Sequence, residues 1–252
     1  MRYFIIVLYG LILGSFLNVC IYRIPNERSI IVPRSHCINC KRNIKWYDLI
    51  PIISYLWLRG RCRYCKSKIS IQYLFVELLT PLIFIFIYNS FGLSFYFFKY
   101  IIFISFLIVI SLIDLKTTDI YMITTIPGII VALAFAIIEN LIYKDGIYNY
   151  IFGSLVASLI IFIIVYLTEG MGKGDIEIFA LVGMFVGVKV SILIILLSFV
   201  LGGLVAGTLV VTKIKNRQDY VAFAPFIASA SLLSIFWGNR IIDLYFTYFK
   251  LL

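Results

Sequence analysis

The stretch that decides the fold is Ile101-Ile-Phe-Ile-Ser-Phe-Leu-Ile-Val-Ile-Ser-Leu-Ile113, which ends at Asp114. It carries no charge, in a chain that is 63% hydrophobic and only 13% charged. Soluble domains hold roughly 45–50% apolar and about 25% charged residues. A helix crosses the bilayer with about 20 mostly apolar residues. The composition therefore predicts that lipid covers much of this chain.

Seven other apolar runs accompany this stretch, and together they predict an all-α polytopic membrane protein with about eight transmembrane helices. Runs of this length favour helices over barrel strands, which show short alternating segments. The first run is interpreted as a retained span and not as a signal peptide, because no clean small-residue cleavage site follows it. The predicted spans are 3–22, 71–88, 96–113, 121–139, 148–168, 176–188, 189–211 and 220–237.

The 22 Lys and Arg residues are distributed unevenly over the predicted loops. Sixteen fall on one side of the membrane, most of them in the polar segment 23–70. The positive-inside rule places this side in the cytoplasm and the N-terminus outside. The net charge of +10 thus reflects topology and attraction to anionic lipid, and we expect no nucleic-acid binding.

The spans and the polar segment predict two regions. Residues 1–95 hold the first spans and the polar segment 23–70, and residues 96–252 form a helical bundle with short connections. The sequence gives no prediction of the oligomeric state.

Four of the five cysteines form two C-x2-C pairs in the polar segment: Cys37, Cys40, Cys62 and Cys65. Two such pairs can bring four thiolates around one zinc ion. The spacing therefore predicts a closed, structural Zn²⁺ site in a cytoplasmic, zinc-ribbon-like segment, with two redox pairs as the alternative. His36 is the only histidine, so a His-rich catalytic metal site is excluded, and we expect it at the surface or beside the zinc site.

Two aspartates mark helix ends on the predicted cytoplasmic side. Asp114 closes the run quoted above, and Asp175 opens the sixth span directly after Gly172-Lys173-Gly174. Carboxylates at membrane depth are costly and suggest function. When two share a site, one stays protonated and the other acts as a base, which suits attack of water on a peptide carbonyl. The glycines would let a substrate approach the backbone closely. A cation site in a transporter remains the alternative.

Other acidic residues receive different interpretations. Asp119 is the competitor of Asp114, and Glu177 would not share a helix face with Asp175. Glu77 lies inside the second span and needs a partner, for which we expect an arginine from the segment 23–70. It forms either a structural ion pair or part of a second site. We expect four loop-edge residues to be solvated: Glu139, Asp145, Glu169 and Asp219.

The chain resembles the bacterial type IV prepilin peptidases, which are membrane aspartyl proteases with a G-x-G-D motif. The resemblance covers nearly the whole chain and rests on a combination of motifs. They are Gly14-Ser-Phe-Leu-Asn-Val-Cys-Ile-Tyr-Arg-Ile-Pro25, Arg34-Ser-His-Cys37, Trp46-Tyr-Asp-Leu-Ile-Pro51, Ser54-Tyr-Leu56, Leu58-Arg-Gly-Arg-Cys62, Val76-Glu-Leu-Leu-Thr80, Ile113-Asp114, Gly172-Lys-Gly-Asp175 and Ala224-Pro-Phe226.

The resemblance implies that Asp114 and Asp175 are the catalytic pair of an enzyme in the bacterial cytoplasmic membrane. Its substrates would be prepilins and pseudopilins, cut after a leader glycine at the cytoplasmic membrane face. The enzyme would then N-methylate the new terminal residue, usually Phe, with S-adenosylmethionine as donor. Residues 1–95 would be the methyltransferase region.

The sequence also offers candidate residues for the two activities. The substrate loop would be Gly172, Lys173 and Gly174, and the methyltransferase candidates are Glu77, Asn18 and Arg23. The chain departs from the family twice, with Ile120-Tyr121 in place of Ile-Pro and Glu177 in place of a lysine. Two other hypotheses are a non-enzymatic zinc-ribbon docking module and an ion-coupled transporter.

Overall fold

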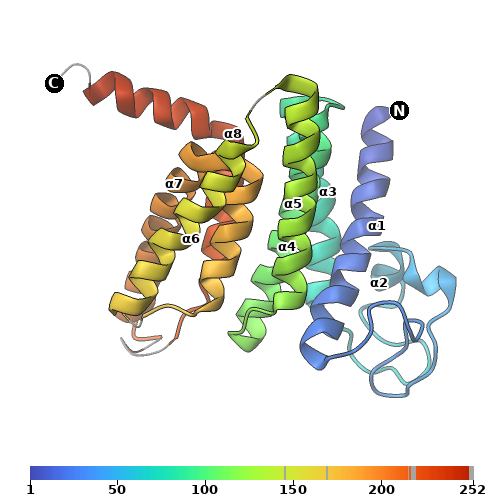
Figure 1. Cartoon of the computed structure of the whole chain (residues 1–252). Helices are drawn as coiled ribbons and strands as arrows, with labels where there is room; N and C mark the ends of the chain where they lie inside the picture. Colours follow the sequence, from blue (N-terminus) through green and yellow to red (C-terminus); the bar gives the residue numbers. More distant parts are fainter. Residues whose placement is uncertain (145, 169, 215, 217–219, 250–252) are drawn as a thin grey trace. The chain divides into compact units, whose positions relative to one another are not determined.

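The computed structural model describes residues 1–144, 146–168, 170–214, 216 and 220–249, apart from the side chain of Phe249. The regular secondary structure of these residues is helical, with no strand and only two isolated β-bridges, which confirms the predicted all-α fold (Figure 1). Two 3-10 turns, Ile24–Asn26 and Trp46–Leu49, lie in the polar segment. The helices are α1 (Arg2–Arg23), α2 (Ile53–Trp57), α3 (Ile71–Phe91), α4 (Phe95–Thr117), α5 (Met122–Tyr143), α6 (Tyr148–Thr168), α7 (Gly174–Val211) and α8 (Ala224–Phe249).

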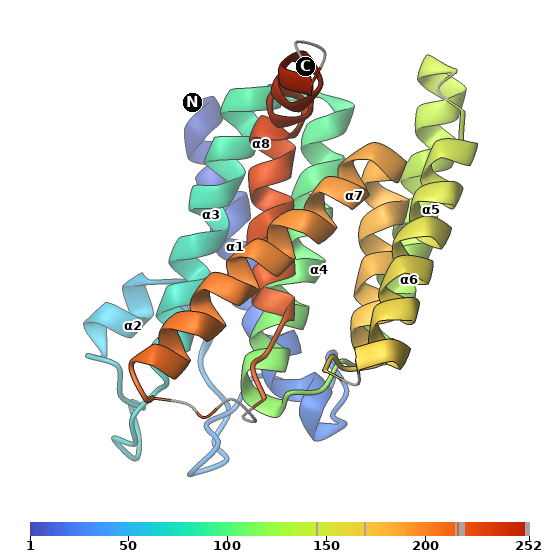
Figure 2. The ribbon, with the colours of Figure 1, turned by 90° about the vertical axis from the view of Figure 1, so that its left-hand side faces the viewer.

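Six of the described helices are long and apolar enough to cross a membrane: α1, α3, α4, α5, α6 and α7. The longest, α7, is interrupted at Gly187, where φ is 77° and ψ is 179°. Glycine adopts such a conformation without steric cost, and a side chain here would collide with Asn149. Figure 2 shows the two halves of α7 running in different directions from this break. The predicted spans 176–188 and 189–211 are therefore the two halves of α7.

The last helix differs from the predicted span 220–237. It begins at Ala224 and continues to Phe249. Pro225 lies in its first turn, where the fixed φ of proline suits a helix start. The polar residues Asn239, Arg240 and Asp243 lie in its second half, and α8 is not among the six apolar helices.

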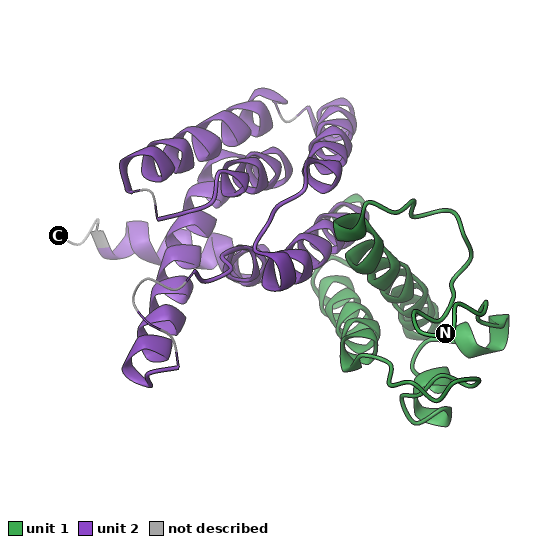
Figure 3. Cartoon of the chain, turned by 90° about the horizontal axis from the view of Figure 1, so that it is seen from below, with its two compact units in different colours: residues 1–97 green, residues 98–252 purple. Residues whose placement is uncertain are grey.

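The chain divides into two compact units, Met1–Phe97 and Phe98–Leu252 (Figure 3). The 1–97 unit holds α1, α2 and α3 with the polar segment, and the 98–252 unit holds α5 to α8 and nearly all of α4. The separate functions expected for residues 1–95 and 96–252 stay predictions.

Close packing of α1 on α3 forms the centre of the 1–97 unit. A Cβ atom on Gly10 would lie 2.6 Å from the Cα atom of Pro81, and one on Gly14 would lie 3.1 Å from the carbonyl oxygen of Val76. Small residues of this kind let membrane helices approach closely and pack firmly. The closely packed helices α1 and α3 therefore form a rigid support for the polar segment.

Two buried side chains, one on α1 and one on α3, bind the backbone of the polar segment. The guanidinium of Arg23 donates hydrogen bonds to the carbonyl oxygens of Ser29, at 2.8 Å, and Pro33, at 2.6 Å. Oε2 of Glu77 accepts the backbone N–H of Ile52 at 2.8 Å. Ile52 has φ 62° and ψ −55°, a conformation that a β-branched residue rarely adopts. The arginine partner expected for Glu77 was wrong, because the described residues form no ion pair with it.

In the 98–252 unit, α6 and α7 approach through glycine. A Cβ atom on Gly153 would lie 2.6 Å from the carbonyl oxygen of Gly183, so the two backbones touch. Phe103 of α4 stacks on Phe185 of α7 with ring centroids 4.7 Å apart. These contacts fix the first half of α7, which begins with Gly174 and Asp175.

A buried ionic cluster joins α4, α5 and α6. Nζ of Lys99 donates to Oε2 of Glu139 at 2.5 Å, and the hydroxyl of Tyr150 donates to Oε1 of Glu139 at 2.5 Å. Lys99 also lies over the Tyr150 ring, 4.2 Å from its centroid. The prediction that Glu139 is solvated was wrong, since its side chain is 2% exposed. The end of α5 thus carries a paired acid.

Candidate active site

Asp114 lies in the last turn of α4, where it also holds the start of α8. The helix ends because Thr118, with φ 57°, donates its N–H back to the carbonyl oxygen of Asp114 at 2.8 Å. The Oδ2 atom of Asp114 accepts the N–H of Ala224 at 2.9 Å, and the hydroxyl of Ser111 donates to the carbonyl oxygen of Ala224 at 3.1 Å. Asp114 is 1% exposed, and its Oδ1 atom has no hydrogen-bond partner among the described residues.

Asp175 is the second residue of α7, in the turn formed by the glycine motif. Its N–H donates to the carbonyl oxygen of Gly172 at 3.1 Å. The side chain is 1% exposed, and neither carboxyl oxygen has a hydrogen-bond partner in the described part of the chain. Because buried polar groups are almost always satisfied, such a group indicates a site that water or another molecule completes.

The structure brings the two aspartates into one electrostatic environment. Asp114 and Asp175 lie close enough for their charges to interact. Burial, together with Asp175, Asp114 and Asp119, raises the pKa of Tyr220 to about 12. The Tyr220 hydroxyl therefore stays protonated at neutral pH and is a neutral group beside the pair. Sequence reasoning missed Tyr220, although it lies shortly before the Ala224-Pro-Phe226 motif.

Two glycines of the predicted substrate loop allow close contacts around Asp175. A Cβ atom on Gly172 would lie 3.2 Å from the Tyr220 hydroxyl oxygen and 3.6 Å from Oδ2 of Asp175. A Cβ atom on Gly174 would lie 2.6 Å from Cβ of Ile120. Lys173 is exposed directly before α7. Gly172 thus leaves space beside Asp175, and Gly174 admits the loop that follows Asp114.

Tyr121 and Glu177 are the two positions at which the chain departs from the family pattern. Tyr121 takes an extended conformation, with φ −100° and ψ 124°, and α5 begins at the next residue. Oε2 of Glu177 accepts the hydroxyl of Thr125 on α5 at 2.6 Å. Glu177 therefore ties α7 to α5.

The remaining acids are less suited to the site. Asp119 is exposed in the α4–α5 loop, whereas Asp114 is buried. This difference favours Asp114 as the first acid. The other expected solvated residues, Asp145, Glu169 and Asp219, lie outside the described residues.

The four predicted cysteines form a cluster that could hold a metal ion, with sulfur atoms that all lie within 4.8 Å of one another. The Sγ atoms of Cys37 and Cys65 are 3.7 Å apart. A tetrahedral zinc ion with Zn–S bonds of about 2.3 Å would separate two ligand sulfurs by about 3.8 Å. The spacing and the chemistry of the sulfur set therefore fit zinc.

The two cysteine pairs form matching turns. In the first turn, Cys37 accepts the N–H of Lys41 and donates its own N–H to Arg42. In the second turn, Cys62 accepts from Lys66 and donates to Ser67 in the same way, and both lysines have φ near 57°. The hydrogen bond from the Ser67 hydroxyl is the main cause that lowers the pKa of Cys65 to about 6. His36 lies outside the sulfur cluster, with Nδ1 3.1 Å from the carbonyl oxygen of Arg34.

The methyltransferase candidates lie along the α1–α3 pair. Asn18 is 1% exposed, and its Nδ2 atom donates to the carbonyl oxygen of Tyr73 at 3.0 Å. Its Oδ1 atom is buried without a hydrogen-bond partner among the described residues. Glu77 lies one turn beyond Tyr73 and also contacts Ser15. Asn18 and Glu77 thus share one interface, whereas Arg23 is bound to the loop 29–33.

Comparisons with known proteins agree over both units. The family model described as Bacterial Peptidase A24 N-terminal domain matches residues 8–91, and that of the Type IV leader peptidase family matches residues 101–207. The prepilin leader peptidase/N-methyltransferase of Bacillus subtilis is 35% identical, over 96% of each chain. The protein of that name from Aeromonas hydrophila is 30% identical, over 97% of this chain and 94% of the relative.

A third relative with the same name, from Pseudomonas aeruginosa, is 28% identical, over 95% of this chain and 91% of its own. The comparison with solved structures gives no match. The family models and the apolar helices together indicate a multi-pass protein of the bacterial inner membrane. The chain belongs to the type IV leader peptidase family.

Proposed function

We propose that this protein cleaves the leader from type IV prepilins and pseudopilins and then N-methylates the new terminal residue, usually Phe. The observation that carries the peptidase part is the pair of buried acids with unpaired oxygens. Asp175 has two such oxygens and Asp114 has one, and the two side chains come from adjoining helix ends of the same unit. The names of the relatives in Bacillus subtilis and Aeromonas hydrophila support both activities.

The two aspartates would divide the acid and base roles. The ionised one takes a proton from a water molecule, whose oxygen attacks the carbonyl carbon of the scissile peptide bond. The protonated one gives its proton to the carbonyl oxygen. When the tetrahedral intermediate collapses, the C–N bond breaks and the leaving nitrogen receives a proton. Two carboxyl groups in one buried site favour this sharing of a single proton.

The surroundings of the pair would position the leader. Gly172 places no side chain between Asp175 and the Tyr220 hydroxyl, so a substrate backbone would approach the pair from this side. The Tyr220 hydroxyl would then border the bound substrate backbone. Lys173, exposed directly before α7, would lie beside the bound chain. Tyr220 and the glycine loop are therefore assigned to substrate binding.

Methyl transfer would take place in the 1–97 unit. S-adenosylmethionine, when bound, supplies an electrophilic methyl group. The unpaired Oδ1 atom of Asn18 suits an ammonium donor, and the carboxylate of Glu77 suits the positive charge of the cofactor. Arg23 would act through the loop 29–33, whose carbonyl groups it holds.

The four cysteines would hold a structural Zn²⁺ ion. Four sulfur ligands leave no open position for catalysis, so the metal would fold a segment that has little apolar core. The excess of basic residues in the segment 23–70 supports a cytoplasmic location for it and an external N-terminus. The aspartate pair would then lie at the cytoplasmic membrane face, where the leader of a membrane-inserted prepilin is accessible.

A cleavage assay on the full-length protein in detergent tests both activities. The substrate is a prepilin-like peptide with a basic leader, a glycine, a phenylalanine and an apolar segment, and the products are weighed by mass spectrometry. With S-adenosylmethionine we expect a shortened product that carries one additional methyl group, and without it a shortened product only. A peptide with a bulky residue in place of the leader glycine is the control. An intact substrate peptide in both reactions would refute the proposal.

A further inference from the structure

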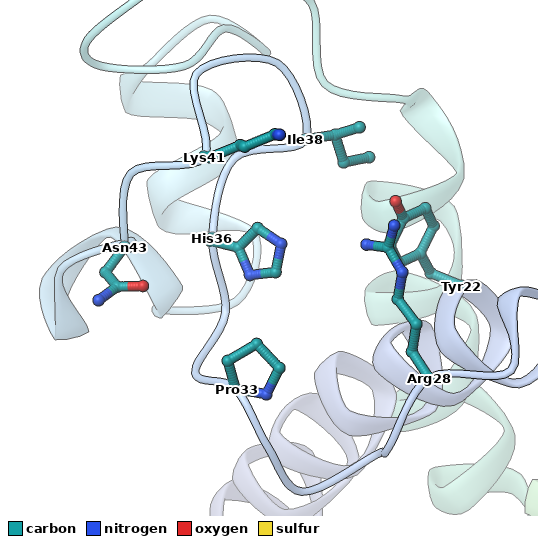
Figure 4. A pocket seen from close by; sticks show the side chains of 7 residues that line it. All are labelled: Tyr22, Arg28, Pro33, His36, Ile38, Lys41 and Asn43. Atoms are coloured by element: carbon teal, nitrogen blue, oxygen red, sulfur yellow. The ribbon is translucent and has the colours of Figure 1, made fainter.

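The polar segment forms a pocket of about 300 Å³ with the end of α1 (Figure 4). In Figure 4 the His36 ring and the Arg28 guanidinium face the same space, and Arg28 lies over the ring of Tyr22. The distance from the Arg28 guanidinium carbon to the Tyr22 ring centroid is 6.0 Å. The pocket is lined by Tyr22, Arg28, Pro33, His36, Ile38, Lys41 and Asn43.

The charge of this lining favours an anion. Arg28 and Lys41 are positively charged, the His36 ring can donate a hydrogen bond, and the lining contains no acidic residue. S-adenosylmethionine carries a net positive charge at neutral pH, so this pocket does not suit it. A phosphate group matches the sign of this lining, and guanidinium groups are frequent phosphate partners in proteins.

An exposed apolar loop lies beside the pocket and leads into it through Pro33. Ile30, Ile31 and Val32 are 41%, 83% and 66% exposed. The loop is nevertheless fixed, because Arg23 binds the carbonyl groups on both sides of it and the Ser29 hydroxyl oxygen accepts the N–H groups of Ile31 and Val32. Three consecutive large apolar side chains held in this way indicate contact with an apolar surface.

The position along the chain identifies that surface. Tyr22 belongs to the last turn of α1, a predicted membrane span, and the loop and pocket follow within a few residues. Residues directly after a span lie at the membrane boundary, where basic side chains meet the headgroups of anionic lipids. Apolar side chains at this level insert between the lipids.

We propose that this pocket and the loop Ile30–Val32 together bind one anionic phospholipid. The lipid phosphate lies between Arg28, His36 and Lys41, and the acyl chains lie against Ile31 and Val32. This site is distinct from the aspartate pair and from the Asn18–Glu77 interface. Its occupation would fix the polar segment at the membrane surface.

Lipid titration with native mass spectrometry tests the proposal on the full-length protein in detergent. We expect phosphatidylglycerol to bind more tightly than phosphatidylcholine. The double variant Arg28→Gln/Lys41→Gln should weaken phosphatidylglycerol binding about 30-fold, because each basic side chain at a membrane surface contributes about one kcal/mol. The matched control Arg59→Gln/Lys66→Gln removes the same charge from exposed positions outside the pocket, and it should bind nearly as the wild type does.

Further binding measurements identify which molecule occupies the pocket. Ile31→Ser should weaken binding of the full lipid but not of soluble glycerol phosphate, because only the lipid has acyl chains. Inorganic phosphate should compete poorly with phosphatidylglycerol. Equal losses in the two double variants would contradict the proposal. Displacement of the lipid by an acidic soluble peptide at similar concentration would assign the pocket to a protein partner and would also overturn it.

Discussion

Glu139 and Asp175 are both acids buried between helices of the 98–252 unit, with exposed fractions of 2% and 1%. Both oxygens of Glu139 accept hydrogen bonds, one from the Lys99 ammonium and one from the Tyr150 hydroxyl. Neither oxygen of Asp175 has a hydrogen-bond partner among the described residues. The two acids are equally inaccessible, but only one of them is satisfied by the fold.

This difference separates structure from function. Glu139 completes an ion pair that ties α5 to α4 and α6, and removal of one partner would leave a buried charge. Asp175 carries an unsatisfied group that destabilises the fold, which is a common feature of catalytic sites. Asp114 is intermediate, since one of its oxygens binds Ala224 and the other is unpaired.

The largest expected effect comes from Asp114→Asn, which removes one acid of the pair. In Asp114→Asn, the side-chain oxygen still accepts the N–H of Ala224, so the helix contact is kept. The acid–base function is lost, and we expect the cleavage rate to fall by about 100- to 10,000-fold. Asp119→Asn, which changes an exposed acid in the adjoining loop, is the control and should cleave at nearly the wild-type rate. Rates measured on a prepilin-like peptide check this, and equal rates for the two variants would contradict it.

Glu139→Gln tests the buried acid whose oxygens are both hydrogen-bonded. It leaves the Lys99 charge buried without its counter-ion, and we expect a loss of about 3 kcal/mol in stability. Thermal unfolding in detergent measures the loss, while the cleavage rate well below the unfolding temperature should stay near that of the wild type. The double variant Lys99→Met/Glu139→Met should recover part of the stability. A Glu139→Gln protein as stable as the wild type would show that the ion pair is not structural.

Gly172→Ala tests the space beside Asp175 by filling it with a methyl group. The new methyl group would lie 3.2 Å from the Tyr220 hydroxyl oxygen and 3.6 Å from Oδ2 of Asp175. We expect cleavage to slow about tenfold, the effect of roughly 1.4 kcal/mol on the barrier. Gly170→Ala, whose methyl group would make only ordinary contacts, is the matched control. Peptide cleavage kinetics decide the matter, and a difference of less than twofold between the two variants would remove Gly172 from the site.

The cysteine cluster differs from both acids, because a metal ion would bind its four sulfur atoms. Cys62→Ser should release the metal and make the segment 23–70 sensitive to protease. Cleavage should change by less than about twofold, because the cysteine cluster and the aspartate pair belong to separate compact units. Cys20→Ser, which changes a buried cysteine of α1 outside the cluster, is the control. Metal analysis and limited proteolysis measure the effect, and an unchanged metal content in Cys62→Ser would refute the site.

Much of this fold was predictable from the sequence because apolar run length reports membrane helices directly. The run Ile101–Ile113 became the centre of α4, and the glycines before Asp175 marked the start of α7. The spacing of the cysteine pairs predicted their cluster. These features depend on local patterns, which a single chain displays.

The contacts between distant residues were not predictable in the same way. Lys99 meets Glu139 across 40 residues, and Glu77 meets the backbone of Ile52 and not an arginine. Helix patterns show which residues share a face but not which helix lies opposite. Tyr220 was missed for the same reason, because only the fold brings it to the aspartates.

The most direct test compares Asp175→Asn with Glu139→Gln in the same detergent and measures cleavage and thermal unfolding for each. Asp175→Asn should lose cleavage and unfold at or above the wild-type temperature, because it replaces an unsatisfied buried acid. Glu139→Gln should keep cleavage and unfold at a lower temperature. Cleavage of the prepilin-like peptide by Asp175→Asn at the wild-type rate would contradict the catalytic role of Asp175.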